Sequence, residues 1–117
     1  MRKPGNTVAF FRKADGTLTG YRAQGHTGYA EAGSDIVCAA VSALTQSTLN
    51  GLKGVLKAPV MYDIDGDKAL LEVQLTPEAT KGQVEAAQLL LVTLLEGLQA
   101  IERSYPRNVR IFFEERR

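Results

Sequence analysis

Apolar and polar positions alternate in two short segments near the amino end, which predicts a β-hairpin. Residues 7–12 and 17–22 are rich in Thr, Val, Phe and Tyr, side chains that favour extended backbone. Asp15-Gly16 lies between the two segments, and Asp-Gly is a common pair in tight hairpin turns. We therefore expect the first two strands here.

A segment without a sustained period follows and leads into the first predicted helix. Residues 23–33 are expected to form a long loop, because they contain the glycines Gly25, Gly28 and Gly33. Ser34 or Asp35 is then the expected cap of an Ala-rich helix that continues to about Val55. Long loops in compact domains are often functional.

The middle of the chain predicts a second hairpin. Residues 59–62 and 68–75 alternate and contain apolar runs. The intervening segment, Asp63-Ile64-Asp65-Gly66-Asp67, has the composition of a turn.

A long amphipathic helix is predicted after this hairpin. Thr76 is the expected cap and Pro77 the first helical residue, where a missing amide hydrogen has no cost. The helix continues to about Arg103, and its apolar residues recur at spacings of three and four: Val84, Ala87, Leu91, Leu94, Leu98 and Ile101. Pro106 ends the helix, and residues 109–113 predict a last strand.

The predicted order β-β-α-β-β-α-β favours an α/β protein of the α+β type, with two helices layered on a largely antiparallel sheet. A length of 117 residues and an apolar content of 44% fit one domain, residues 1–117. The continuous apolar runs are shorter than the roughly 20 residues of a bilayer span, and no secretory signal is evident. We therefore expect a cytoplasmic protein without membrane contact.

Charge and cysteine content narrow the function classes further. The chain has 14 Lys and Arg against 13 Asp and Glu, so its net charge of +1 gives no reason to expect direct nucleic-acid binding. Cys38 is the only cysteine, which excludes a disulfide within the chain and fits a reducing compartment.

Two polar motifs resemble a calcium-binding loop and a nucleotide-binding loop, but their residue spacing does not match either. Counted from Asp63, glycine is fourth and Gln74 is twelfth, whereas a calcium loop needs glycine sixth and glutamate twelfth. Gly25-His26-Thr27-Gly28 lacks the lysine and the spacing of a nucleotide-binding loop. A zinc site would need more than one cysteine and one histidine, so we expect neither a metal nor a cofactor.

Cys38 is the strongest candidate for catalytic chemistry. It falls in the first turn of the predicted helix, where unpaired amides and the helix dipole favour a thiolate and could also hold an oxyanion. His26, the only histidine, precedes it by twelve residues, and a folded loop could bring the imidazole to the sulfur. The imidazole would then take the thiol proton and return it to a leaving amine. Taken alone, a cysteine such as Cys38 is more often a small buried hydrophobe than a nucleophile.

Asp35 and Ser42 share a helical face with Cys38, because they precede and follow it by three and four residues. Asp35 is expected to cap the helix or to orient the imidazole. Ser42 is expected to be a supporting hydrogen-bond partner.

These motifs also carry a family resemblance. Gly25-His26, followed after a gap by Gly33-Ser34-Asp35-Ile36-Val37-Cys38-Ala39-Ala40-Val41-Ser42-Ala43-Leu44, resembles the Prp family of ribosomal-processing cysteine proteases. The order of elements is similar over nearly the whole chain. The resemblance implies a catalytic dyad of His26 and Cys38, with Asp35 and Ser42 at recurring family positions.

The resemblance also implies a substrate and an assembly. Family members remove the short amino-terminal extension of a bacterial large-subunit ribosomal protein, the twenty-seventh of that series, by cleavage after a phenylalanine pair. A homodimer in the bacterial cytoplasm is implied too, with Gly25, Gly28 and Gly33 as hinges of a loop that closes over the peptide. Thr27 departs from the small alanine usual in the family, which bears on specificity and leaves the dyad unchanged.

A noncatalytic ribosome-assembly or RNA-binding accessory protein is the alternative function. In that case Cys38 would lie in the core, and the basic ends Arg2-Lys3 and Arg116-Arg117 would touch phosphate. The near-neutral net charge argues against it. For a protease, Tyr29 and the apolar surface around Leu49 are the expected contacts of the substrate's aromatic residues.

Overall fold

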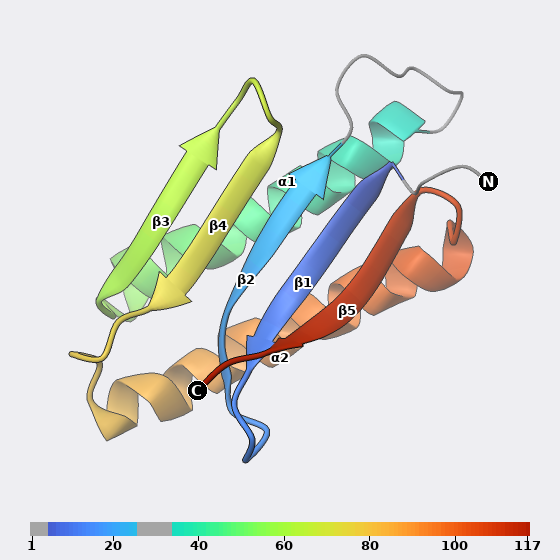
Figure 1. The fold of residues 1–117 in the computed structure, drawn as a ribbon. Helices are drawn as coiled ribbons and strands as arrows, with labels where there is room; N and C mark the ends of the chain where they lie inside the picture. Colours follow the sequence, from blue (N-terminus) through green and yellow to red (C-terminus); the bar gives the residue numbers. More distant parts are fainter. Residues whose placement is uncertain (1–4, 26–33) are drawn as a thin grey trace.

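The computed structural model describes residues 5–25 and 34–117, with only the backbone of Ser34 and Asp35, and its elements follow the predicted order (Figure 1). The helix α1 (Ser34–Asn50) continues into one turn of π-helix, η1 (Gly51–Val55), where the sequence predicted the end of one longer helix. The remaining bounds are β1 (Asn6–Arg12), β2 (Leu18–Gly25), α1 (Ser34–Asn50), β3 (Val60–Asp65), β4 (Leu70–Leu75), α2 (Lys81–Ser104) and β5 (Val109–Glu115).

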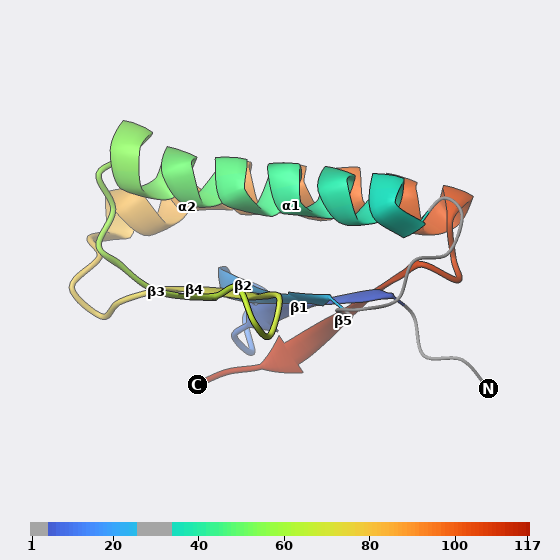
Figure 2. The ribbon, with the colours of Figure 1, turned by 90° about the horizontal axis from the view of Figure 1, so that it is seen from above.

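The strands form a five-stranded sheet in the order β3-β4-β2-β1-β5. Neighbouring strands are antiparallel except for β1 and β5, which are parallel. Both helices lie on the same face of the sheet (Figure 2). The predicted α+β architecture with a largely antiparallel sheet is therefore confirmed.

The hydrophobic core lies between this face of the sheet and the two helices. Phe10, Tyr21 and Val73 project from three adjacent strands and are fully buried. The helix α2 contributes its predicted apolar face through the buried residues Ala87, Leu91, Leu94 and Leu98. Leu49 of α1 belongs to the same core and is 4% exposed, so the expected substrate contact around Leu49 is wrong.

The helix α2 is also long and apolar enough to span a bilayer by length and composition alone. The sequence did not predict this, because its apolar residues are interrupted by polar ones and form no long continuous run. Its buried stripe packs on the sheet, as in the core helix of a globular domain.

The start of α2 differs from the prediction. Thr80 caps the helix, since its side chain accepts from the Gln83 amide while the Gln83 side chain accepts from the Thr80 amide. Thr76 belongs to the preceding turn, where its amide donates to the carbonyl of Pro59 at 3.0 Å. The helix therefore begins four residues after the position favoured by Thr76-Pro77.

The second hairpin has longer pairing than predicted, because β3 continues through Asp65. Asp65 Oδ1 accepts from the amides of Asp67 and Lys68 at 3.0 and 3.2 Å. The aspartate therefore stabilises the turn, as expected for this segment.

The opposite face of the sheet carries a buried aromatic residue beneath charged side chains. Phe11 alternates with the core residue Phe10 and is 0% exposed, and the Arg116 guanidinium carbon lies 3.9 Å from its ring centroid. Arg22 of β2 forms ion pairs with Glu72 of β4 at 2.9 Å and with Glu114 of β5 at 3.1 Å. These long side chains shield the ring from water with their stems.

Candidate active site

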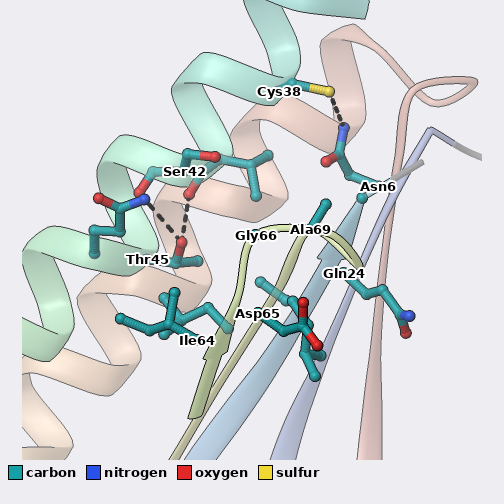
Figure 3. A pocket seen from close by; sticks show the side chains of 15 residues that line it. Asn6, Gln24, Cys38, Ser42, Thr45, Ile64, Asp65, Gly66 and Ala69 are labelled. Carbon is teal, nitrogen blue, oxygen red and sulfur yellow. Dashed lines mark hydrogen bonds between the residues drawn. The ribbon is translucent and has the colours of Figure 1, made fainter. Parts of the chain in front are cut away.

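Cys38 lies on α1 above the start of β1, and its side chain is partly buried (Figure 3). It is the fifth residue of a helix that begins at Ser34, so it lies just beyond the first turn in which the sequence placed it. The neighbouring Val37 and Val41 are buried against the sheet and fix the rotation of the helix. This rotation directs the sulfur toward the edge of the core.

Asn6, the first residue of β1, contacts the sulfur directly. Its Nδ2 lies 3.2 Å from Cys38 Sγ and 3.3 Å from the Asn108 carbonyl oxygen, while the residue as a whole is only 5% exposed. The Asn108 carbonyl can only accept, which fixes the nitrogen of the Asn6 amide on this side. The sulfur therefore receives an N–H donor.

Gly25 lies against the Asn6 side chain on the neighbouring strand. The two residues are paired across β1 and β2, and a Cβ at position 25 would lie 3.1 Å from Asn6 Oδ1. The Gly25 amide also donates to the Ala69 carbonyl at 3.0 Å. Gly25 is thus a strand residue in a tight contact, which corrects the expectation that it is a loop hinge and that the loop begins at Ala23.

A cleft of about 390 Å³ opens beside Cys38, between α1 and the turn that joins β3 to β4. Figure 3 shows Ser42 and Thr45 on its helical side and Ile64, Asp65 and Gly66 across from them. Apolar side chains dominate the floor and walls, including Val41, Ala69 and Leu71. Such a cleft can receive a peptide with an apolar side chain near the sulfur.

Ser42 lines this cleft one turn after Cys38, on the face that its spacing predicted. The other candidates are less fully described. Asp35 is in α1, but its side chain lies outside the described part of the chain. His26, Gly28, Gly33 and Tyr29 also lie outside the described residues, so the pairing of His26 with Cys38 and the loop hinges stay predictions.

Sequence reasoning missed Asn6 and Thr45. Thr45 is buried, and its carbonyl accepts from the Tyr21 hydroxyl at 2.6 Å, which ties α1 to β2 beneath the cleft. A polar residue at the head of an apolar strand and a threonine one turn beyond Ser42 were the only sequence signals. Among the side chains that the structure describes, no three His, Cys, Asp or Glu gather at a metal-binding distance.

Comparison with known proteins identifies the family. Residues 7–110 match the family described as Cysteine protease Prp. The chain belongs to this family. It is therefore a cysteine-type peptidase, which answers the choice between a catalytic protein and a noncatalytic accessory protein.

Two curated Prp relatives cover most of the chain. The Ribosomal processing cysteine protease Prp of Staphylococcus aureus strain Mu50 is 31% identical over 110 residues, which is 92% of this chain and 98% of the relative. The protein of that name from Bacillus subtilis strain 168 is 28% identical over 100 residues, covering 86% and 89% of the two chains.

Solved structures support the fold at similar identity. The S. aureus Prp in complex with a substrate peptide has a TM-score of 0.81 and 28% identity, covering 93% of this chain and 99% of that chain. A Streptococcus mutans protein has a TM-score of 0.82 and 29% identity over 97% of each chain. The S. aureus protease has also been solved with a covalently linked product peptide, at a TM-score of 0.77 and 28% identity, covering 93% of this chain and 99% of that chain.

Proposed function

We propose that Cys38 is the nucleophile and His26 the general base of a peptidase that processes a ribosomal protein. The observation that carries the proposal is that Cys38 is the only cysteine in a chain that belongs to a family of cysteine proteases. Its sulfur also borders a cleft and receives an amide donor, as a reactive thiolate would require.

The reaction proceeds through a thioester. The Cys38 thiolate attacks the scissile carbonyl, and the His26 imidazolium gives its proton to the leaving amine. His26 then takes a proton from water, which attacks the thioester and releases the carboxyl product and the thiolate. Asp35 orients the imidazole or caps the helix, and Ser42 supports the site from the same helical face.

The substrate in this proposal is the amino-terminal extension of the twenty-seventh bacterial large-subunit ribosomal protein, cut after a phenylalanine pair. Relatives named as ribosomal processing proteases and an S. aureus relative solved with a substrate peptide support it. The apolar lining of the cleft, with Val41, Ile64 and Leu71, suits a phenylalanine side chain beside Cys38.

The enzyme acts as a homodimer in the bacterial cytoplasm in this proposal. Gly28 and Gly33 give the loop the freedom to close over the peptide, and Thr27 adjusts its fit. A net charge of +1 supports recognition of the peptide without direct contact with nucleic acid.

The direct test is cleavage of a peptide that copies the phenylalanine-pair site. The parent should cut it after the pair, Cys38→Ala should lose at least about 1,000-fold in rate, and His26→Ala about 100-fold or more. Ser47→Ala, an exposed change on the same helix, is the matched control and should cut like the parent. Mass spectrometry of the products locates the cut.

Each possible result of this test would contradict a different part of the proposal. Cleavage that persists in Cys38→Ala would contradict the proposed nucleophile, and parent-like cleavage by His26→Ala would contradict the base. If the parent ignores this peptide but its thiol is reactive, the enzyme has another substrate. If a peptide with alanines in place of the phenylalanine pair is cut equally fast, the proposed specificity is wrong.

A further inference from the structure

We propose that Asn6 is a positioning residue for the catalytic sulfur, in that its side-chain amide holds Cys38 Sγ and stabilises its thiolate form. This inference rests on the proposed role of Cys38 as the nucleophile. The contact joins two residues that are 32 positions apart, at the head of β1 and near the start of α1.

Because Asn6 is buried, its side-chain amide needs hydrogen-bond partners within the protein. A buried amide is costly unless its polar atoms are hydrogen-bonded, and Asn6 is only 5% exposed. Its Nδ2 has two hydrogens and two acceptors within reach, the Asn108 carbonyl at 3.3 Å and Cys38 Sγ at 3.2 Å. The bond to Asn108 orients the amide so that its second hydrogen is directed at the sulfur.

The backbone holds the amide in this orientation as well. The main-chain amide of Asn6 donates to the same Asn108 carbonyl at 2.9 Å, so one acceptor fixes both ends of the residue. The Asn6 side chain is therefore held before the sulfur ionises. A donor that is already in position needs no rearrangement when negative charge appears on the sulfur.

The chemistry of the acceptor makes this contact selective for one protonation state. A thiolate accepts a hydrogen bond much more strongly than a neutral thiol, because bonds to charged acceptors are roughly twice as strong. Asn6 therefore shifts the balance of Cys38 toward the form that attacks a carbonyl. The bond weakens when the sulfur becomes a thioester and strengthens again when water releases the acyl group.

Gly25 supplies independent evidence that space has been kept for this amide. A Cβ at position 25 would lie 3.1 Å from Asn6 Oδ1, closer than most real contacts of such an atom. Gly25 also directly precedes His26 in the sequence. The same short segment therefore leads to the proposed base and leaves room for the residue that holds the nucleophile.

A purely structural Asn6 would tie β1 to the turn before β5 and merely touch the sulfur. The pH dependence of iodoacetamide alkylation separates the two roles, because only a thiolate donor changes the pH at which Cys38 becomes reactive. We compare the parent with Asn6→Leu and Asn6→Asp, which remove the donor at similar volume. Thr19→Val is the matched control, since Thr19 is buried in β2 and does not line the cleft.

The expected result is an upward shift of the alkylation midpoint by roughly one to two pH units in Asn6→Leu. Asn6→Asp should shift further, because its carboxylate opposes a second negative charge. Below the midpoint the Leu variant should lose about tenfold or more in both alkylation and kcat for the peptide, with KM nearly unchanged. Thr19→Val should follow the parent at every pH.

Gly25→Ala tests the same contact from the other side. It should raise the midpoint when Asn6 is present and have no further effect in the Asn6→Leu background. Circular dichroism identifies folded variants, and if Asn6→Leu fails to fold, Gly25→Ala tests the shift, because Asn6→Asp adds a charge that raises the midpoint by itself.

A midpoint within about 0.3 pH units of the parent in a folded donor-free variant would overturn the role of Asn6. That result is independent of the nucleophile test, because cleavage by Cys38→Ala would overturn the role of Cys38 even if Asn6 moves the midpoint.

Discussion

At the scale of single residues, Tyr21 links the sheet to the helix that carries Cys38. Its ring is fully buried, and its hydroxyl donates to the Thr45 carbonyl at 2.6 Å, two helical turns after Cys38. This bond gives the Thr45 carbonyl a side-chain donor from the sheet in addition to the hydrogen bonding within α1. We therefore expect Tyr21 to hold the floor of the cleft in place.

Removing this hydroxyl should destabilise the protein and change its response to alkaline pH. Tyr21→Phe is expected to lower the free energy of unfolding by about 1–2 kcal/mol at neutral pH, because the Thr45 carbonyl loses its buried donor. Urea denaturation measures the change. Equal stability of parent and variant would show that the hydrogen bond makes no net contribution.

The pH dependence follows from the protonation of the phenol. Burial raises the pKa of Tyr21 above its ordinary value of about 10. The unfolded chain thus loses this proton at lower pH than the folded protein, so the associated stability is complete below about pH 10 and declines above it. Between pH 9 and 11, Tyr21→Phe should lose less stability than the parent in parallel urea titrations.

The difference between the residues that sequence reasoning found and those it missed has a physical basis. Cys38 was recognised as the only cysteine near a predicted helix start, and Ser42 because the helical period places it on the same face, where it lines the cleft. Asn6 had no such signal, since its burial depends on Gly25 and Asn108, which are distant in the sequence. Only the assembled sheet brings these groups together.

At the scale of elements, the sequence predicted the centres of the strands and helices correctly but some of their ends incorrectly. Alternation predicted the strands that the structure describes, and helical periodicity predicted α2, because apolar faces must be buried. The helix α1 was predicted from its cap and its Ala-rich composition. The end of β2 was wrong because residues 23–25 look like a loop, although pairing with β1 and β4 holds them in the sheet. Pairing with strands that are distant in the sequence gives no signal in the local residue pattern.

The start of α2 can be tested by comparing the predicted cap with the observed one. Thr80→Ala removes a reciprocal pair of hydrogen bonds and should lower the free energy of unfolding by about 1 kcal/mol. Thr76→Ala should cost less than about 0.5 kcal/mol, because among the described residues the Thr76 side chain bonds only to exposed Glu78. Thermal or urea unfolding of both variants measures the two losses of stability. A larger loss in Thr76→Ala would contradict this assignment.

At the scale of the whole molecule, the proposed homodimer predicts the mass of the protein in solution. We expect light scattering to give about twice the chain mass of 12.7 kDa, as a homodimer requires. The measurement should be repeated at the concentration used for peptide cleavage. A mass of a single chain in an actively cleaving sample would contradict the proposed dimer.

The contact between Asn6 and Asn108 spans 102 residues of sequence, and β1 and β5 are parallel neighbours. A ribosome makes the chain from its amino end, so Asn6 is synthesised long before the carbonyl that orients its side chain. Under the proposed role of Asn6, the contact that holds the Cys38 sulfur is therefore complete only when almost the whole domain has been synthesised. A growing chain of this protein should therefore lack the Asn108 carbonyl that orients Asn6 toward the sulfur until β5 joins the sheet.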